Sequence, residues 1–263
     1  MTLQLTALNI YPIKSAAGIA ANEWDVDGLG LRFDRRWMVV DSTGMFLTQR
    51  VHPRMAFIIP SITRNTLSVD APGMSTLELP LEPSKAVSTK VTIWRDSCAV
   101  TWLGEKAADW FTDYLGVACS LVHMADDVIR PTNPDFAPGG RVSFADGYPF
   151  LLISEESLLD LNNRLLEPLP MNRFRPNLVV AGGAPYAEDD WSRISIGGLV
   201  LRVVKPCFRC VITTTDQLTA RRTKEPLRTL ATYRRMGGEV MFGQNVVHEG
   251  TGRLTVGDMV SLL

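Results

Sequence analysis

The sequence predicts a mostly β (α+β) protein with two β-barrel-like domains and a few flanking helices. Two observations support this prediction. Most apolar residues fall in short segments that alternate at period two, and Gly, Pro, Asn or Asp turns separate these segments. A closed or nearly closed barrel suits many short strands because it leaves no sheet edge exposed.

The first half of the chain is expected to form a small antiparallel sheet or barrel. Residues 3–11 alternate between apolar and polar side chains, and Pro12 ends the pattern. Further strands are expected at residues 36–41, 45–50, 56–63, 66–69, 77–81, 90–94, 99–103 and 119–124. Residues 105–115 have helical apolar spacing and stop before Gly116, which predicts one helix.

A loop is expected between the two halves. Residues 125–140 contain three prolines and the pair Gly139-Gly140, a composition that disfavours regular structure. We therefore expect an N-terminal β-barrel domain over residues 1–125 and a second domain over residues 126–263.

The second half repeats the mainly β pattern. Ser154, followed by Glu155 and Glu156, predicts the start of a helix that runs through Arg164, because a hydroxyl caps the helix and acids favour its first turn. A second helix is expected near Pro226. Strands are expected at residues 177–181, 193–196, 199–205, 211–214, 239–248 and 253–263.

Overall charge excludes some classes of partner. The 263 residues carry 27 basic and 28 acidic side chains, so nucleic acid is not expected as a partner. The first residues lack the pattern of a signal peptide, and no apolar run approaches the roughly 18 residues of a membrane span. We expect a cytoplasmic protein without a membrane partner.

Two of the four cysteines, Cys207 and Cys210, are three residues apart. Structural zinc would need four Cys or His ligands, and the three histidines are scattered. A redox dithiol belongs at a helix N-terminus, whereas this pair lies between predicted strands. Buried thiols remain an alternative, although Arg209 beside Cys210 favours a thiolate. Cys98 and Cys119 are expected to be buried thiols.

Several cations stand at the ends of predicted strands. Lys14-Ser15 follows the first strand and precedes a small-residue turn, a combination that can hold a phosphate. Arg35, Arg50 and Arg175 occupy similar places, and a guanidinium can bind phosphate through two parallel hydrogen bonds. The alternative is that these are solvated surface cations. Trp94 is assigned to packing, and the scattered His123 is expected to be a core or surface histidine without a site role.

Ordered motifs run through nearly the whole chain. The first half holds Tyr11-Pro12-Ile13-Lys14-Ser15 and Asp34-Arg35-Arg36-Trp37. The second half holds residues 146–154, Phe174-Arg175-Pro176-Asn177, residues 186–189, Cys207-Phe208-Arg209-Cys210, residues 224–227 and residues 242–244. This set resembles the MOSC family of molybdenum-cofactor-binding proteins, which is related to the C-terminal part of molybdenum cofactor sulfurase. The first half resembles the β-barrel domain that precedes MOSC in the mitochondrial amidoxime-reducing component and its bacterial relatives.

The resemblance implies a molybdenum cofactor (Mo-molybdopterin) and no use of pyridoxal phosphate. It implies that Cys210 is the metal ligand and the catalytic residue, while Cys207 has no ligand role. A soft thiolate suits such a metal. By the same resemblance, the residues that bind the cofactor are Lys14, Ser15, Arg35, Asp146, Gly147, Tyr148, Arg175, Asn177, Phe208, Arg209 and Asn245. Arg36 and Asn245 stand where the amidoxime-reducing component has aromatic residues, and which arginine of Arg35-Arg36 points inward is left open.

The activity implied by the resemblance is a reductase. Such an oxidoreductase converts hydroxylamines, amidoximes or N-hydroxylated bases to amines or amidines. The chain has no four-cysteine iron-sulfur signature, so electrons are expected from a separate protein such as a ferredoxin, a flavin reductase or a cytochrome b5-like protein. The alternatives are a non-catalytic cofactor carrier and a dithiol protein without molybdenum.

Overall fold

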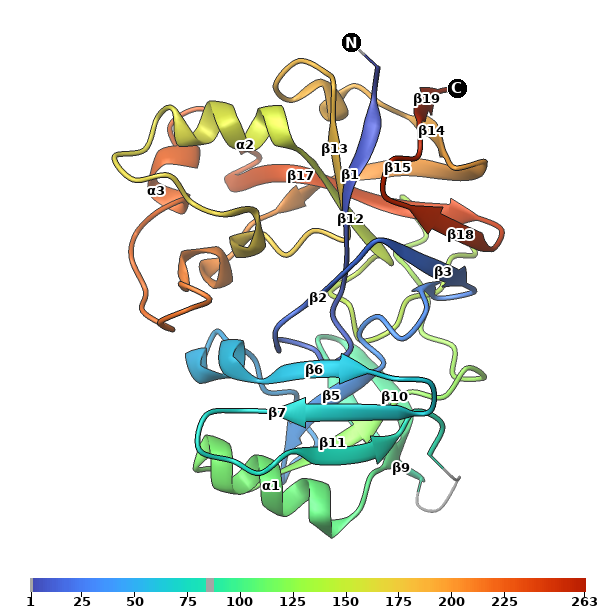
Figure 1. The fold of residues 1–263 in the computed structure, drawn as a ribbon, viewed down its shortest axis with the longest axis vertical. Helices are drawn as coiled ribbons and strands as arrows, with labels where there is room; N and C mark the ends of the chain where they lie inside the picture. Colours follow the sequence, from blue (N-terminus) through green and yellow to red (C-terminus); the bar gives the residue numbers. More distant parts are fainter. Residues whose placement is uncertain (1, 84–87) are drawn as a thin grey trace.

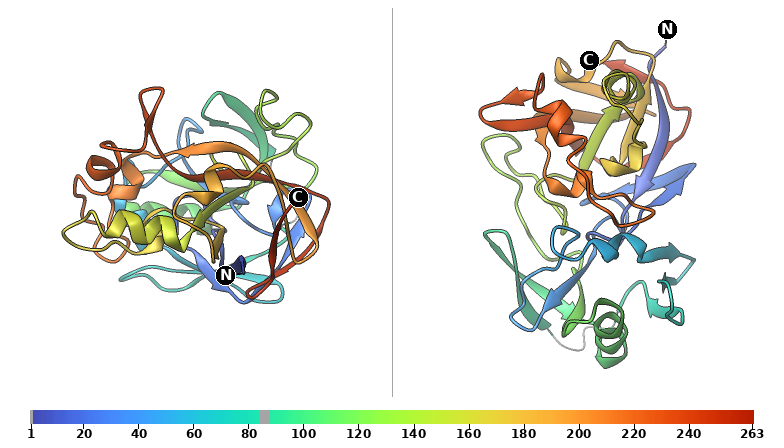
Figure 2. Two further views of the ribbon diagram at one scale, coloured as in Figure 1. Left: turned by 90° about the horizontal axis from the view of Figure 1, so that it is seen from above. Right: turned by 90° about the vertical axis from the view of Figure 1, so that its left-hand side faces the viewer.

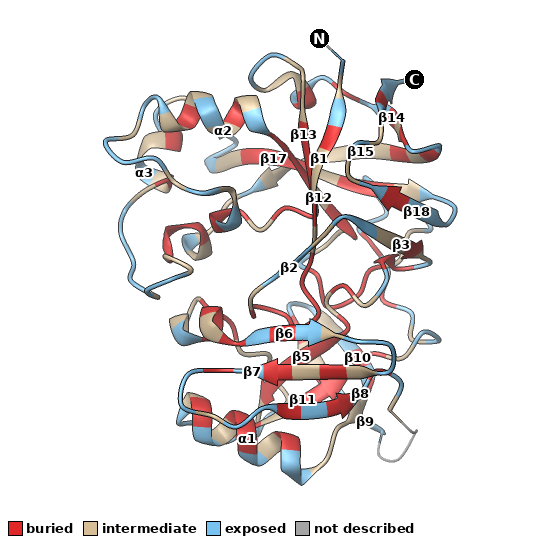
Figure 3. Ribbon diagram, viewed as in Figure 1, coloured by how far each residue is buried: buried red, intermediate tan, exposed pale blue. Residues whose placement is uncertain are grey.

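Residues 2–83 and 88–263 are described by a computed structural model, in which two β-rich bodies lie one above the other (Figure 1). The upper body contains residues 2–10, 19–31 and 150–263, and the lower body contains residues 37–123, against which residues 11–18 pack. Buried side chains concentrate on the strands inside each body (Figure 3). Figure 2 shows from two further sides that strands form most of both bodies. The predicted mostly β fold with few helices is confirmed; the strands form several sheets, of which one curves into a half-barrel.

The upper body is built on a nine-stranded sheet in the order β19-β14-β15-β17-β12-β13-β1-β2, with β16 paired to β17. Only β12 and β13 run parallel, and their connection contains helix α2 (Glu155–Asn162). The strands are β1 (Gln4–Ile10), β2 (Ile19–Ala21), β12 (Phe150–Ser154), β13 (Leu178–Ala181), β14 (Arg193–Ile196), β15 (Leu199–Phe208), β16 (Arg235–Met236), β17 (Glu239–Glu249) and β19 (Val260–Leu262).

Backbone hydrogen bonds bring the two ends of this sheet together. The Leu5 N–H donates to the Asp258 carbonyl at 2.9 Å, and the Val260 N–H donates to the Leu3 carbonyl at 2.9 Å. The start of β1 is thereby joined to the segment that leads into β19. The curved sheet encloses an apolar core to which Leu5, Phe150 and Leu201 contribute, as expected of a barrel.

A three-stranded sheet adds a second link between the chain ends. It pairs β18 (Gly252–Thr255) with β3 (Glu23–Asp27), which pairs in turn with β4 (Gly30–Leu31). Strands β1 to β4 therefore pack with the second half of the chain. The expected boundary at residue 125 follows the sequence order, whereas in space the chain begins in the upper body, builds the lower one and returns through residues 124–149.

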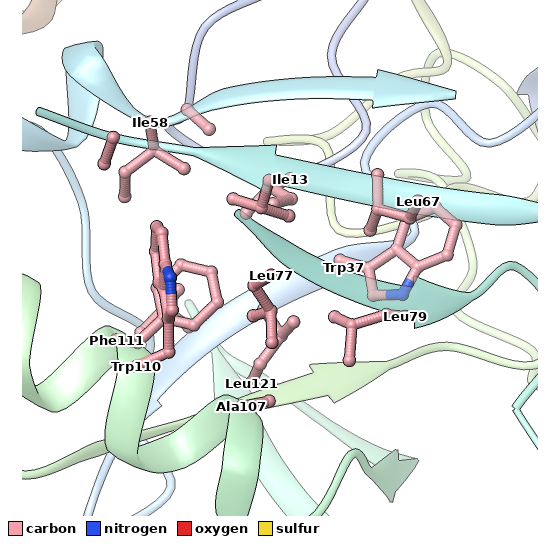
Figure 4. Close-up of a cluster of buried hydrophobic side chains, with 14 of the residues drawn as sticks. Ile13, Trp37, Ile58, Leu67, Leu77, Leu79, Ala107, Trp110, Phe111 and Leu121 are labelled. Atoms are coloured by element: carbon pink, nitrogen blue, oxygen red, sulfur yellow. The ribbon is translucent and has the colours of Figure 1, made fainter. Parts of the chain in front are cut away.

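The lower body holds two smaller sheets and one helix around its own core. One sheet has the order β5-β11-β10-β9 and the other has the order β6-β7-β8. Helix α1 (Glu105–Leu115) buries Trp110 and Phe111 in the apolar cluster shown in Figure 4. The strands are β5 (Trp37–Asp41), β6 (Ile59–Ile62), β7 (Thr66–Asp70), β8 (Leu77–Pro80), β9 (Ser88–Ile93), β10 (Asp96–Trp102) and β11 (Cys119–His123).

Most predicted elements are present, but three local predictions are wrong. Residues 45–50 form only isolated bridges instead of a strand. Residues 56–63 divide into the end of the 3₁₀ helix η1 (Pro53–Phe57) and strand β6. The predicted strand at 211–214 is the 3₁₀ helix η4 (Val211–Thr214), because the Thr213 and Thr214 hydroxyls donate to the carbonyls three residues earlier.

Other elements differ from prediction in their extent, or lie outside the predicted elements, as do β2, β3, β4 and β16. Strand β12 lies in the middle of the large sheet, and its apolar run after the 143–149 loop was not recognised as a strand. The helix near Pro226 is the single turn α3 (Leu227–Leu230). Residues 253–263 divide into β18 and β19 at Gly257, whose φ of +103° favours glycine. Within the described ranges, no helix has the length and apolar content needed to cross a bilayer.

Burial changes the proton affinity of His123 at the end of β11. Its ring lies 4.9 Å from the ring of Trp37, and the residue is 8% exposed. Burial, followed by the charge of Arg36, lowers the pKa of His123 from 6.5 to about 4. A histidine with a depressed pKa in the folded state destabilises the protein as the pH falls below 6.5, because the unfolded chain then binds more protons.

We expect His123→Gln to reduce the loss of stability on acidification. The histidine should account for about 3 kcal/mol of the unfolding free energy lost between pH 7.5 and pH 4. Urea unfolding of both proteins across this pH range measures the difference. His52→Gln is the control, since that residue lies in a turn only partly shielded from solvent. Parallel pH curves for wild type and His123→Gln would contradict the assignment.

Candidate functional site

The segment that follows β1 crosses from the upper to the lower body and carries Lys14 and Ser15. The Lys14 N–H donates to the Trp37 carbonyl at 2.8 Å, and the Trp37 N–H donates to the Pro12 carbonyl at 3.1 Å. The Arg35 N–H donates to the Tyr11 carbonyl at 2.8 Å. These bonds hold the two predicted cation motifs side by side between the bodies.

Lys14 is a buried cation with an acidic partner. It is 5% exposed, and its Nζ donates to the Phe144 carbonyl at 2.8 Å and to Asp146 Oδ1 at 2.5 Å. Burial lowers the pKa of Lys14, while Asp146 opposes that change. Burial would raise the pKa of Asp146, but Lys14 and Arg50 together hold it well below its usual range. The Asp146 side chain is 59% exposed, so this ion pair opens to solvent on the acidic side.

Arg50 and Trp94 form the wall beside this ion pair. The Arg50 guanidinium lies 3.5 Å from Asp146 Oδ2 and 4.7 Å from the centre of the Trp94 ring. The Trp94 Nε1–H donates to Asp146 Oδ1 at 3.4 Å. Trp94 occupies the turn between β9 and β10 and is 44% exposed, so its assignment to packing is wrong. Sequence alone could not show that this hairpin turn reaches the site.

Tyr11, Arg35 and Arg175 form a second cationic group. Each guanidinium carbon lies 4.3 Å from the centre of the Tyr11 ring, a cation–π distance. Arg35 donates to Asp34 at 2.5 Å and to Asn177 Oδ1 at 3.0 Å. Burial above all lowers the pKa of Arg175 to about 10, and no hydrogen bond to a described residue engages its guanidinium.

Arg36 points away from this group. Its guanidinium donates to the Met124 carbonyl and pairs with Asp126 at 2.5 Å, and the residue is 3% exposed. Arg35 is therefore the member of the Arg35-Arg36 pair that faces the crossing segment. The question left open by the sequence is settled by the backbone turn at Arg35, whose φ is +50°.

Unusual backbone conformations gather at these residues. Seven non-glycine residues of the described chain have positive φ, and Ser15, Arg35, Trp94 and Arg175 are four of them, with φ between 50° and 67°. The left-handed region is unfavourable for residues with a Cβ atom, and such residues cluster at functional sites. Their presence supports a binding role for this region.

The Cys207-x-x-Cys210 segment ends strand β15 and begins η4. The Arg209 N–H donates to the Val240 carbonyl at 2.8 Å. The Arg209 guanidinium donates to Cys207 Sγ at 3.1 Å and to the Phe174 carbonyl at 2.6 Å, and its buried Nε has no partner in the described structure. The sulfur that contacts Arg209 is thus Cys207, not Cys210 as expected. Cys210 is partly exposed.

The remaining candidates lie around these groups. Asn177 is 1% exposed and bonds Asp34 as well as Arg35, so it joins the second cationic group. Gly147 and Tyr148 follow Asp146 on the returning loop, and burial raises the pKa of Tyr148. Phe208 is 51% exposed at the end of β15. Asn245 donates to the Pro206 carbonyl at 3.3 Å within the sheet, and none of its bonds reaches the cationic groups.

A strap formed by residues 215–222 joins η4 to the lower body. The side-chain amides of Gln49 and Gln217 bond reciprocally at 3.2 and 3.1 Å, and Gln49 also donates to the Ser15 carbonyl at 2.8 Å. Arg222 donates to the Gln49 carbonyl and to Thr215 Oγ1. The strap therefore links the element that follows Cys210 to the turn at Ser15. Gln49 was not predicted as a site residue.

The site as a whole suits an anionic group bound next to a thiol. Five cations, Lys14, Arg35, Arg50, Arg175 and Arg209, face two carboxylates, Asp34 and Asp146. The unpartnered Arg209 Nε and the free face of Arg175 leave donors for a ligand. No three His, Cys, Asp or Glu side chains gather as a metal site in the part of the chain described. A metal at Cys210 would therefore take its other ligands from a bound cofactor.

Comparison with known proteins agrees with the motif resemblance. The model of the MOSC N-terminal beta barrel domain matches residues 2–118, and the model of the MOSC domain matches residues 139–261. Human mitochondrial amidoxime-reducing component 1 is 36% identical over 280 residues, which cover 97% of this chain and 81% of the relative. The chain belongs to the MOSC family.

Two further relatives and one solved structure are also similar to this chain. Rat mitochondrial amidoxime reducing component 2 is 36% identical over 272 residues, covering 95% of this chain and 80% of that protein. Tomato molybdenum cofactor sulfurase is 36% identical over 264 residues, covering 91% of this chain but 32% of the longer relative. The YuaD protein of Bacillus subtilis aligns over 99% of this chain and 94% of its own with a TM-score of 0.46 and 13% identity.

Cys98 and Cys119 lie on strands β10 and β11 of the lower body, not among the site residues. Both are buried free cysteines, as predicted. Burial raises the pKa of each thiol, so neither is primed as a thiolate.

We expect Gln49→Ala to lower the free energy of unfolding by about 1–3 kcal/mol, because the buried Ser15 carbonyl and Gln217 lose their partner. Gln217→Ala should cost about 1 kcal/mol, and the double variant less than the sum. Urea unfolding measures all three. Leu218→Ala is the matched control in the strap, because that side chain is 84% exposed. Additive costs would show that Gln49 and Gln217 do not act together.

Proposed function

We propose that this protein is a molybdenum-cofactor-dependent reductase of N-hydroxylated compounds. Such a reaction converts R–NH–OH, two electrons and two protons into R–NH₂ and water. The observation that carries the proposal is the placement of an anion-holding cation cluster and a partly exposed thiol on either side of one strap. The 36% identity to the human amidoxime-reducing component, across nearly the full chain, supports the same activity.

The cation cluster would hold the phosphate and pterin end of the cofactor. Lys14 and Ser15 supply an ammonium and a hydroxyl, and Arg35 and Arg175 supply guanidinium groups that bind phosphate oxygens in pairs. Asp34 and Asn177 keep Arg35 in place through hydrogen bonds of 2.5 and 3.0 Å. These groups are oriented before any ligand binds, which lowers the entropic cost of binding.

The thiol end would hold the metal. The cofactor supplies a molybdenum centre that exchanges two electrons, and the Cys210 thiolate is the soft protein ligand suited to it. The Arg209 guanidinium donates a hydrogen bond to the Cys207 sulfur and so fixes the orientation of Cys207, the cysteine that is not the proposed ligand. Asp146, Gly147, Tyr148, Phe208 and Asn245 remain proposed lining residues.

Electrons are proposed to come from a separate redox protein, and the protein is proposed to act in the cytoplasm. A reductase must receive two electrons in each turnover. The chain carries four cysteines, none of them in an iron-sulfur pattern. We therefore propose a partner for electron supply in addition to the small-molecule substrate.

A dye assay tests the enzymatic proposal. Protein purified after cofactor-replete expression is mixed with dithionite-reduced methyl viologen and benzamidoxime or hydroxylamine, and dye oxidation is followed. Turnover above one equivalent, with benzamidine as product, is the expected result. A molybdenum-loaded protein that oxidises no dye with any N-hydroxylated compound would instead be a cofactor carrier.

We expect Cys210→Ser to lose molybdenum and at least about tenfold in dye turnover while it keeps pterin, because a hydroxyl is a hard, weakly acidic ligand. Elemental analysis and pterin fluorescence after oxidation measure the two parts of the cofactor separately. Cys207→Ser is the matched control and should keep both. Loss of metal from Cys207→Ser alone would move the ligand assignment to Cys207.

A further inference from the structure

Positive charge is concentrated in residues 220–238, a segment of the upper body between η4 and β17. Residues 220–238 contain six basic side chains and one acidic side chain, a formal charge of +5, whereas the whole chain has a charge of −1. Arg221, Lys224, Arg228 and Arg235 are exposed. Of these four, Arg228 alone pairs with a carboxylate in the described structure, Glu225 at 2.9 Å. Three full charges thus face solvent without an acidic partner.

This charged segment is hydrogen-bonded at both ends to the elements around Cys210. The Thr223 N–H donates to the Thr214 carbonyl of η4 at 3.2 Å. At the other end, Arg235 pairs with Val240, whose carbonyl accepts the Arg209 N–H at 2.8 Å. In Figure 1, α3 and the chain leading to it lie along one side of the upper body. The cations therefore lie beside the thiol end of the site.

Large apolar side chains are exposed in the same elements. Phe208 is 51% exposed and Val211 is 39% exposed, and these residues flank Arg209 and Cys210. Met236 is 55% exposed beside Arg235, and Leu218 in the strap is 84% exposed. Apolar side chains surrounded by charged ones are the usual composition of a surface that binds another protein.

We propose that these four cations, together with Val211, Leu218 and Met236, form the docking surface for an acidic electron-transfer protein, next to Phe208 at the cofactor site. The proposal rests on the proposed function, since a reductase must receive its electrons near the metal ligand. Attraction between opposite charges would accelerate encounter and fix the orientation of the donor, and the apolar side chains would be buried on contact.

The charge distribution favours a compact acidic protein over a long polyanion. Removing the +5 of residues 220–238 from the total of −1 leaves −6 on the rest of the chain. An extended nucleic acid or an anionic membrane would meet this negative remainder beyond the patch, whereas a small donor covers the patch alone. Val211, Leu218 and Met236 would also stay in contact with water if the surface bound the phosphates of a nucleic acid.

Charge reversal tests the surface. The docking variant is Arg221→Glu/Lys224→Glu/Arg235→Glu, which leaves out Arg222 because it bonds Gln49 and Thr215. The matched control is Arg64→Glu/Lys90→Glu/Lys106→Glu, which reverses three exposed cations of the lower body. Both variants change the net charge equally, so a difference between them reports position.

Two acidic probes serve as donor to the cofactor-loaded protein, a reduced plant-type ferredoxin and a reduced soluble cytochrome b5 domain. With at least one of them, we expect the docking variant to lose about tenfold in kcat/KM for the donor at low salt, and the control to lose much less. The difference should shrink towards 0.5 M NaCl, where charges are screened beyond about 4 Å. Dye-driven turnover should be equal in all three proteins.

Binding and dye assays separate failure of this surface from failure of the proposed function. Calorimetry with the oxidised donor should show weaker binding for the docking variant alone, whether or not the wild type turns over dye. Wild type that oxidises no dye would remove the enzymatic proposal, and the binding result would still decide the surface. Equal donor affinity in both variants, or charge-dependent binding to duplex DNA or phosphatidylserine vesicles in place of the donors, would overturn the docking proposal.

Discussion

The buried carboxylate of Asp34 is the contact on which the site geometry depends. It accepts the Tyr11 N–H at 2.8 Å, the Arg35 guanidinium at 2.5 Å and the Asn177 side-chain amide at 3.1 Å. These partners come from the crossing segment, the turn before β5 and the start of β13, so one side chain joins both bodies. Burial raises the pKa of Asp34, and the charge and hydrogen bonds of Arg35 oppose that rise. Losing one member of such a buried pair costs about 3–5 kcal/mol.

The path of the chain explains why the site needs both bodies. Strand β1 lies in the upper sheet against β13, and the chain then passes into the lower body at Lys14 and Ser15. The strap at residues 215–222 returns from the upper body to Gln49. The turn at Lys14 and Ser15 is therefore tied to the upper body by strand β1 and, through Gln49 and Gln217, by the strap that follows Cys210. Relative movement of the bodies would change the spacing between the two ends.

Basic side chains are concentrated in two places, one for each proposed partner: inside the site for the cofactor, and on the surface beside it for the electron donor. Inside the site, cations outnumber carboxylates and would bind an anionic cofactor. On the surface next to Cys210, Arg221, Lys224 and Arg235 have no acidic partner among the residues described and would attract an acidic protein. Both sets belong to a chain of nearly neutral net charge, so their positions, not the total, provide the selectivity.

Sequence patterns by themselves determined the mainly β fold, helix α1, the two buried thiols and the family, because each depends on local periodicity or on ordered motifs. Tertiary structure decided what depends on contacts between distant residues. It showed that β1, at the start of the chain, pairs with β13 from the second half. It also showed that Arg35 faces the site while Arg36 does not, and that Arg209 donates to Cys207. It also brought Trp94 and Gln49 to the site. Trp94 meets Asp146, 52 residues later, and Gln49 meets Gln217, 168 residues later, only once the sheets have formed, and no local pattern records such contacts.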